Sequence, residues 1–328
     1  MKNWQEVLNL IEKFHIYSST EVTFTALDAL SQIFHESSSF SEAFKNAEEF
    51  LKRLFSLRPT SVMTLNVMSS LLSGLENLAR NFTSLKDVVD ELDTRISFLT
   101  KEISSKTSTV AALGARRVRE GDKLLTCSYS RTVKAMFSKL KEEGKDVHVY
   151  VTESRPGGEG VALAKELGKM SFPVELIVDS AVRFYMKDIN IVVVGAEAIA
   201  ANGAVVNKVG TSLIALAAHE ARVRTFVLAS THKFSPETVF GELVRLPVIK
   251  DTGLLPGLER YSDLNVAVPL FDVTPPRHID AIVTDKGVVA PEAVILLVKE
   301  LYGWPPASIE PLSIIRKLAQ VSARGDSQ

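Results

Sequence analysis

One cysteine is present among the 328 residues, so the chain cannot form a disulfide bond within itself. No apolar run reaches the ~18 uninterrupted residues that suggest a membrane span. Basic and acidic residues number 38 and 39, so the chain lacks the basic excess of proteins that coat nucleic acids. These absences predict a cytoplasmic protein with neither a membrane nor nucleic acid as a direct partner.

Three widespread ligand motifs are also missing. The sequence has no Gly-x-Gly-x-x-Gly of dinucleotide sites, no Gly-Lys-Ser/Thr phosphate loop and no Gly-x-Ser-x-Gly nucleophile turn. The six histidines are scattered without the spacing of metal ligands, and His219 and His232 fit structural roles in a helix and at a strand end. We therefore expect no metal and no cofactor.

Hydrophobic spacing divides the chain into two regions. Residues 1–120 carry apolar side chains at helical spacing and predict a helical amino-terminal domain, with helices that include Phe40–Leu57, Val62–Leu78 and Leu92–Val118. In residues 121–328, short β-branched runs alternate with helical patterns, which is typical of right-handed βαβ units. We expect an α/β fold whose second domain is a Rossmann-like, doubly wound parallel sheet that binds a ligand and forms oligomers.

The second domain contains regular strand signals and one long loop. Its strands are expected at Lys123–Cys127, Val147–Thr152, Val174–Val178, Ile189–Val194, Thr225–Ser230 and Ile279–Thr284. Phe234–Pro276 is long and rich in proline and glycine, with the apolar run Leu254–Leu258 in its middle. A loop of this length is unusual in a compact domain. Two interpretations stay open, a subunit contact and an ordinary surface excursion.

The stretch Ile191–Thr211 carries the most chemistry. A buried-strand run stops at Gly195 and is followed by the carboxylate of Glu197, and a loop of small residues then presents Asn207 and Lys208. In open α/β sheets, ligands bind beyond the carboxyl ends of the strands. An acid, an amide and an ammonium at that place predict a site for a small polar or phosphorylated ligand.

Two further turns follow predicted strands. Thr126–Arg131 ends the first strand, and its hydroxyls either donate to phosphate oxygens or cap the next helix, with Ser128 or Ser130 as the capping residue. Arg155–Gly160 places glycines where the backbone can approach a ligand, although glycines are common in such turns. Cys127 is interpreted as a small buried residue, because no histidine or acid lies close to it in sequence.

Together these features resemble one family, which is shared by the alpha, beta and delta regulatory subunits of translation initiation factor 2B and by isomerases of ribose 1,5-bisphosphate and methylthioribose 1-phosphate. The resemblance runs from about Leu57 to Trp304. Short islands carry it, in the order Arg58–Val62, Val151–Pro156, Asp179–Ala181, Val194–Glu197, Asn202–Ala204, Asn207–Thr211, Lys233–Phe234, Phe271–Pro276 and Thr284–Gly287. It implies a helical domain before a Rossmann-like domain, and assembly into homodimers or higher homo-oligomers.

The resemblance also implies where isomerase chemistry lies. In the family, hydrogen transfer between adjacent carbons is assigned to a cysteine at the first strand end and to an aspartate after Gly-Ala. Those positions hold Ser128 and Glu197, and Cys127 is expected to face the opposite side of the strand. A serine hydroxyl has no accessible anion near neutral pH, and a displacement of about 1 Å in an acid can cost roughly a hundredfold in rate. The Arg-Gly-Ala phosphate loop of the isomerases is missing from His15–Thr25.

We therefore interpret the chain as an initiation-factor-2B-alpha-like regulatory protein. It is expected to be non-catalytic, to retain a pocket for a sugar phosphate or nucleotide, and to contact initiation factor 2 or related subunits. Tyr129-Ser130-Arg131 and Gly-Ala-Glu favour that branch, whereas Leu213–Pro236 and Phe271–Pro276 resemble the isomerases more closely. The expected ligand-binding residues are Arg58, Ser128, Arg131, Asn207, Lys208 and Lys233.

Two alternatives stay open. One is a ribose 1,5-bisphosphate isomerase that uses Glu197 as acid and base, with Cys127 or a water in place of the lost thiol. The other is an oligomeric scaffold with an emptied pocket.

Overall fold

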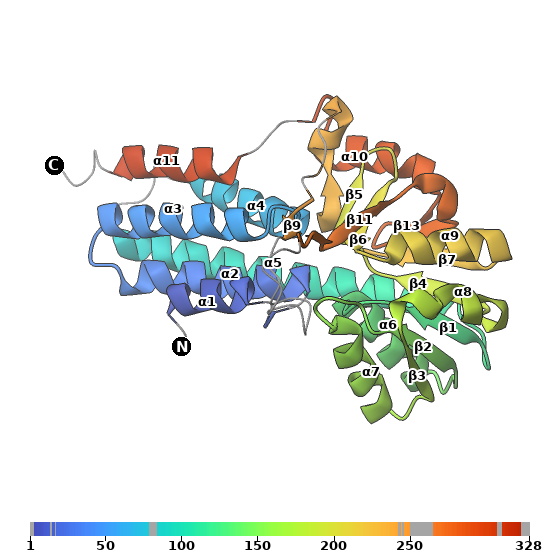
Figure 1. Ribbon diagram of the computed structural model, residues 1–328. Coiled ribbons are helices and arrows are strands. Elements are labelled where there is room, and N and C mark those ends of the chain that lie inside the picture. Colours follow the sequence, from blue (N-terminus) through green and yellow to red (C-terminus); the bar gives the residue numbers. More distant parts are fainter. Residues whose placement is uncertain are drawn as a thin grey trace. The chain divides into compact units, whose positions relative to one another are not determined.

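The computed structural model describes residues 3–13, 15–16, 18–78, 84–241, 244, 246–249, 265–306 and 310–322 (Figure 1). The chain divides into two compact units. The first contains the described residues of Met1–Ser105 and Ala307–Gln328, and the second contains those of Lys106–Pro306. No described helix is both long enough and apolar enough to cross a membrane.

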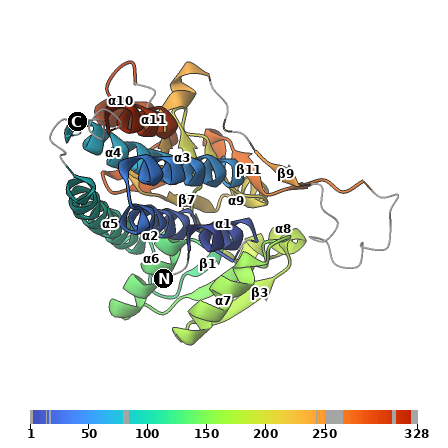
Figure 2. The same ribbon diagram turned by 90° about the vertical axis from the view of Figure 1, so that its left-hand side faces the viewer.

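The first unit is built from helices. They are α1 (Trp4–Glu12), α2 (Ser19–Glu36), α3 (Phe40–Leu57), α4 (Val62–Leu78), the part of α5 (Leu85–Ala115) up to Ser105, and α11 (Pro311–Ser322). The predicted bounds of α3 and α4 are confirmed, whereas α5 begins earlier than predicted. Figures 1 and 2 show α1, α2 and α3 side by side, and Phe34, Phe50 and Leu72 lie in the buried core. Ser18 and Ser39 cap α2 and α3 by accepting from a backbone N–H of the first turn.

The second unit is centred on a sheet that has, within the described residues, seven strands in the order β13-β12-β7-β4-β1-β2-β3 (Figure 1). Neighbouring strands are parallel except for β12 and β13. The strands are β1 (Lys123–Thr126), β2 (His148–Thr152), β3 (Val174–Ile177), β4 (Ile191–Val194), β7 (Arg224–Leu228), β12 (Ala281–Thr284) and β13 (Gly287–Val289). A helical amino-terminal region followed by a mostly parallel sheet confirms the predicted fold class.

Helices cover both faces of this sheet. One face is covered by α6 (Arg131–Glu142), α7 (Glu159–Lys169) and the end of α5, and the other by α8 (Val182–Tyr185), α9 (Thr211–Ala221) and α10 (Val294–Tyr302). Leu124 packs among the buried side chains under α6 and α7, and Leu125 among those under α9 and α10. Successive side chains of a strand point to opposite faces of the sheet. Short 3₁₀ helices connect these elements: η2 (Asp179–Ala181), η3 (Met186–Asp188), η4 (Thr231–Lys233), η5 (Pro236–Phe240), η7 (Pro276–His278) and η8 (Pro291–Ala293).

A smaller sheet was not predicted. Its order is β11-β6-β5-β8, made of β5 (Ala198–Ala200), β6 (Val205–Lys208), β8 (Phe234–Ser235) and β11 (Phe271–Thr274). The expectation of a loop between Glu197 and Asn207 is wrong, because β5 and β6 pair antiparallel there. β5 is the three-residue run Ala-Ile-Ala, and β6 has four residues and ends in Asn-Lys, so neither gives a clear strand signal. The pairing holds the candidate acid and amide on one rigid element.

Two other segments also depart from expectation. The sequence analysis grouped all residues after 120 in one domain, but α11 packs on α3 and α4 through Ile314, Ile315 and Leu318. The long segment Phe234–Pro276 contains β8, β11 and the antiparallel pair β9 (Val248–Ile249) and β10 (Val268–Pro269). Leu254–Leu258 lies outside the described residues, so the subunit contact and the surface excursion both stay predictions.

Candidate active site

The order of the parallel strands reverses between β1 and β4. From β1 the chain adds β2 and β3 on one side, and from β4 it adds β7 and β12 on the other. At such a switch point the loops after two adjacent strands diverge, and ligands of doubly wound sheets bind in the crevice between them. Residues 127–131 follow β1 and residues 195–197 follow β4, so the two predicted turns meet at this edge.

Gly195 allows these two turns to pack closely. A Cβ at this position would lie 2.6 Å from Ser130 Oγ, well inside van der Waals contact. Ser130 is the N-cap of α6, and its hydroxyl accepts a hydrogen bond from Val133 N at 3.3 Å. Of the two capping alternatives, the structure therefore supports Ser130, and Ser128 is left for another role.

Two serines at the strand ends hold a left-handed backbone. Ser128 and Ser154 both have φ of 60°, which is uncommon outside glycine. Ser128 N donates to Ser154 Oγ at 2.7 Å, and Asp179 accepts from Ser154 N and Arg155 N at 2.8 and 2.7 Å. These bonds tie together the turns after β1, β2 and β3. Strained backbone of this kind gathers at functional sites.

Glu197 places a buried carboxylate beside a buried ammonium. The residues Glu197 and Lys233 are 6% and 5% exposed. Backbone N of Glu197 donates to Val206 O at 2.8 Å, and Lys233 Nζ donates to Ala196 O. Burial lowers the pKa of Lys233, and the negative charge of Glu197 acts in the opposite direction. The pair gives this edge an acid whose charge is compensated from within the fold.

Asp285, which follows β12, anchors the turn that carries Lys233. Its carboxylate accepts from Thr231 N at 2.6 Å and from Thr231 Oγ1 at 3.0 Å. Lys106, on α5, donates to Thr231 Oγ1 at 3.3 Å and lies 4.0 Å from Asp285 Oδ2. The position of Lys233 is therefore fixed by groups from three elements.

Asn207 and Lys208 lie at the end of β6, just before α9. Asn207 Nδ2 donates to Thr211 Oγ1 at 3.0 Å, and Thr211 Oγ1 donates to Lys208 O at 2.6 Å. Lys208 Nζ donates to Glu159 Oε1 at 2.8 Å, and both side chains are buried. The predicted ammonium is therefore present at the edge, but it is engaged by a carboxylate that sequence reasoning did not identify.

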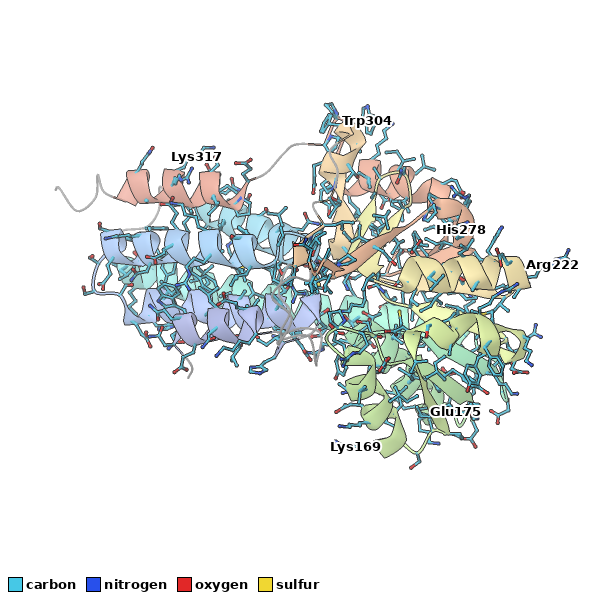
Figure 3. The ribbon with its side chains drawn as sticks, viewed as in Figure 1. Lys169, Glu175, Arg222, His278, Trp304 and Lys317 are labelled. Carbon is cyan, nitrogen blue, oxygen red and sulfur yellow. The ribbon has the colours of Figure 1, made fainter. Side chains whose placement is uncertain are left out.

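Asp272, on β11, holds the amino terminus of α9. One carboxylate oxygen accepts from Gly210 N and Ser212 N at 2.8 and 3.1 Å. Burial raises the pKa of Asp272 to about 6, while these two hydrogen bonds act to lower it. Arg222 marks the opposite end of α9 and points away from the sheet (Figure 3). The carboxylate thus fixes the helix end that faces the candidate site.

Cys127 faces the apolar cluster under α9, together with Leu125 of the same strand face. Its Sγ is hydrogen-bonded to Thr211 Oγ1 at 3.4 Å. Burial raises the pKa of the Cys127 thiol to about 12, the bond to Thr211 lowers it, and nearby carboxylates led by Asp272 raise it further. The thiol is therefore protonated at neutral pH and contributes packing.

Replacing this cysteine is expected to be mild. In Cys127→Ala we expect a loss of about 1 kcal/mol in the free energy of unfolding, from the small cavity. The native thiol should also resist iodoacetamide at pH 7, because only the thiolate reacts. Urea denaturation and mass spectrometry measure the two quantities. Rapid alkylation of the folded native protein at pH 7 would contradict a purely packing role for the sulfur.

The remaining predicted residues lie in different surroundings. Arg131 is the first residue of α6 and is exposed. Arg58 belongs to the helical unit, where it is buried at the end of α3 and its backbone N donates to Leu54 O at 3.0 Å. The structure brings Ser128, Glu197, Asn207, Lys208 and Lys233 to the carboxyl edge of the sheets.

Four acids at this edge were missed as functional candidates. They are Glu159, Asp179, Asp272 and Asp285. Three of them lie inside the islands of family resemblance, which was a usable signal, but no role was attached to them. Glu159 lies in the glycine-containing turn after β2, which was considered for its glycines alone.

Comparison with known proteins gives a consistent family assignment. The model of the initiation factor 2 subunit family matches residues 15–291. Ribose 1,5-bisphosphate isomerase of Methanocaldococcus jannaschii is 37% identical over 92% of this chain and 96% of its own length. The enzyme of the same name from Thermococcus kodakarensis is 34% identical over 94% of this chain and 98% of its own.

A solved structure agrees with the fold. The crystal structure of translation initiation factor eIF-2B from Pyrococcus horikoshii OT3 superposes with a TM-score of 0.74 at 27% identity, covering 89% of this chain and 98% of that chain.

These relatives overturn the interpretation as a non-catalytic regulatory protein. Five relatives named ribose 1,5-bisphosphate isomerase are 34–37% identical over 89–94% of the chain. The main interpretation of the sequence is therefore wrong, and the findings favour the enzyme that was held as its alternative. The error came from giving two substituted positions, Ser128 and Glu197, more weight than the similarity of the whole chain. The expected contact with initiation factor 2 stays a prediction.

Proposed function

Because the chain belongs to the initiation factor 2 subunit family, we propose that it is a sugar-phosphate isomerase that converts ribose 1,5-bisphosphate into ribulose 1,5-bisphosphate. The names of its relatives support this substrate. Within the structure, the observation that supports it most is the buried Glu197 and Lys233 at the switch point of the sheet. Aldose–ketose isomerisation needs an acid/base group held out of bulk water, and a buried carboxylate with a compensating cation meets that need.

The reaction moves hydrogen between two carbons and needs no oxidant. A base removes the proton on C2, the bond between C1 and the ring oxygen breaks, and that oxygen takes a proton. The enol phosphate that results has a double bond between C1 and C2. C1 then accepts a proton, and the C2 hydroxyl loses its proton to become the ketone. One carboxyl group on one face of the sugar can perform both carbon steps.

We assign those two steps to Glu197. As a carboxylate it takes the proton from C2, and as a carboxylic acid it returns a proton to C1. Lys233 places a positive charge near the acid, and its bond to the Ala196 carbonyl holds the backbone next to the acid. Lys233 is therefore a positioning residue in this proposal.

The substrate has two phosphate groups, hydroxyl groups on C2 and C3, and a ring oxygen, and the site has to hold these groups. We assign Ser128 and Asn207 to hydroxyl groups at the crevice, and Arg131 to a phosphate group, because a guanidinium matches phosphate with paired hydrogen bonds.

We also propose that the protein works as a homodimer or larger homo-oligomer. Leu213 and Leu216 on α9 are 54% and 39% exposed, and Val273 on the neighbouring β11 is 45% exposed. Exposed apolar side chains on neighbouring elements favour an interaction surface.

A direct assay tests the function. Purified protein incubated with ribose 1,5-bisphosphate should produce ribulose 1,5-bisphosphate, followed by 31P NMR or by a coupled ketose assay. Catalysed conversion with kcat in the usual range of about 1–10³ s⁻¹ is the expected result. Absence of ketose after prolonged incubation with folded protein, confirmed by circular dichroism, would contradict the proposal.

A further inference from the structure

Lys208 is already paired inside the protein. Its Nζ lies 2.8 Å from Glu159 Oε1, and the side chains of Lys208 and Glu159 are 6% and 10% exposed. The residues are 49 positions apart in the chain and come from β6 and the first turn of α7. At this distance the two opposite buried charges largely cancel, so a ligand in the crevice experiences little net charge from the pair.

The turn before α7 is built around the carboxylate of Glu159. A Cβ on Gly157 would lie 2.7 Å from Glu159 Oε1, so a residue larger than glycine would displace the acid. Gly158 has φ of 71° and precedes the first residue of α7, whose helix amino terminus favours a negative charge. Glu159 Oε2 is buried and has no hydrogen-bond partner among the residues that the structure describes. The acid is therefore held by Lys208, and Gly157 leaves room for it.

A lysine that is paired with a carboxylate recognises a different part of the substrate than an unpaired lysine does. An isolated ammonium attracts phosphate, but a phosphate beside Lys208 would also face the carboxylate of Glu159 and be repelled by it. An ammonium that donates one hydrogen bond to a carboxylate still has two N–H groups that can donate to an uncharged hydroxyl. The charge of the pair thus favours a hydroxyl over a phosphate at this corner.

We propose that Glu159 is a positioning residue that sets specificity. It neutralises Lys208, aims the ammonium at a hydroxyl of the sugar, and keeps the phosphate groups of the substrate away from this corner. The inference rests on the proposed function only in taking a sugar phosphate as the substrate class. It replaces the expectation that Lys208 is a phosphate ligand.

Binding of inorganic phosphate tests this without any turnover. Isothermal titration at low ionic strength compares the native protein with Glu159→Gln, Lys208→Met and the double variant. We expect phosphate to bind about tenfold more tightly to Glu159→Gln, about tenfold more weakly to Lys208→Met, and within about twofold of the native value to the double variant. The gain in Glu159→Gln should shrink as salt is added.

Glu166→Gln is the matched control. It lies on the same helix and also removes a Glu–Lys pair, with Lys134, but that pair is at the surface. Its phosphate affinity should equal the native value. A merely structural role for Glu159 would not tighten phosphate binding in any variant.

If a single variant unfolds, phosphate affinity can still be measured in the double variant, because replacing both partners of a buried ion pair is often tolerated. A tenfold loss of phosphate affinity in the folded double variant would show that Lys208 binds phosphate as a free cation, and would overturn the inference. Unchanged affinity in a folded Glu159→Gln would do the same. If the native protein fails to isomerise ribose 1,5-bisphosphate, the proposed function falls while this binding cycle is still read independently.

Discussion

Glu197→Gln is expected to lower kcat by about 10³-fold with KM changed by less than about threefold. The amide has the shape of the acid but cannot take the C2 proton, and loss of a general acid/base group typically costs about 10²–10⁴-fold. Because the interaction is made in the transition state and not in substrate binding, the loss should fall on kcat. Glu197 is 6% exposed, so a base from bulk solvent is not expected to replace its carboxylate.

The control for this variant is Glu175→Gln. Glu175 lies on the edge strand β3 at the periphery of the second unit, where it is paired with His148 at 3.0 Å (Figure 3). Its replacement makes the same chemical change far from the switch point and should leave kcat within about twofold. The assignment of Glu197 fails if both variants, each shown to be folded by thermal denaturation, retain native kcat.

Lys233→Met is expected to lower kcat by about 10²-fold at pH 7. The variant removes the cation near Glu197 and the hydrogen bond that Lys233 Nζ donates to Ala196 O, so the backbone next to the acid is no longer held. A misplacement of about 1 Å in a catalytic group can cost roughly a hundredfold in rate. Native kcat in a folded Lys233→Met would contradict the positioning role.

Lys233→Met should also change how the free energy of unfolding depends on pH. The pKa of Lys233 is lowered in the folded protein, so below its ordinary value of 10.5 the unfolded chain binds more protons. The free energy of unfolding contributed by this group therefore rises with pH in the window below 10.5. Lys233→Met should lack that rise, whereas Lys286→Met, which removes a partly exposed lysine paired with Glu300 at 3.2 Å, should keep it. Urea denaturation across pH 7–10 measures both, and identical slopes in the two variants would contradict the buried-ammonium account.

Local pattern was sufficient for the large elements. The helical spacing of Phe40–Leu57 and Val62–Leu78 matched α3 and α4, and the β-branched runs located the parallel strands to within a few residues. Alternation along β1 also indicated that Cys127 would face the core, and its position in the apolar cluster under α9 agrees. These features depend on neighbours in sequence, so the sequence contains them directly.

The candidate site depends on contacts that no local pattern carries. Glu159 and Lys208 are 49 positions apart, and Asp272 reaches Gly210 across 62. The hairpin of β5 and β6, which holds Glu197 and Asn207, is formed by strands of three and four residues and is stabilised by its neighbours in the sheet. The functional error had a related cause, because Ser128 and Glu197 were judged as single substitutions without the buried Lys233 that compensates the acid.

The most direct measurement of the central claim is the conversion of ribose 1,5-bisphosphate in D₂O, followed by 13C and 2H NMR. Proton transfer through Glu197 predicts ribulose 1,5-bisphosphate with deuterium on C1 in at least part of the product, and at least a hundredfold less product with Glu197→Gln. No ketose from the native protein, or deuterium-free ketose formed equally fast by Glu197→Gln, would contradict the account.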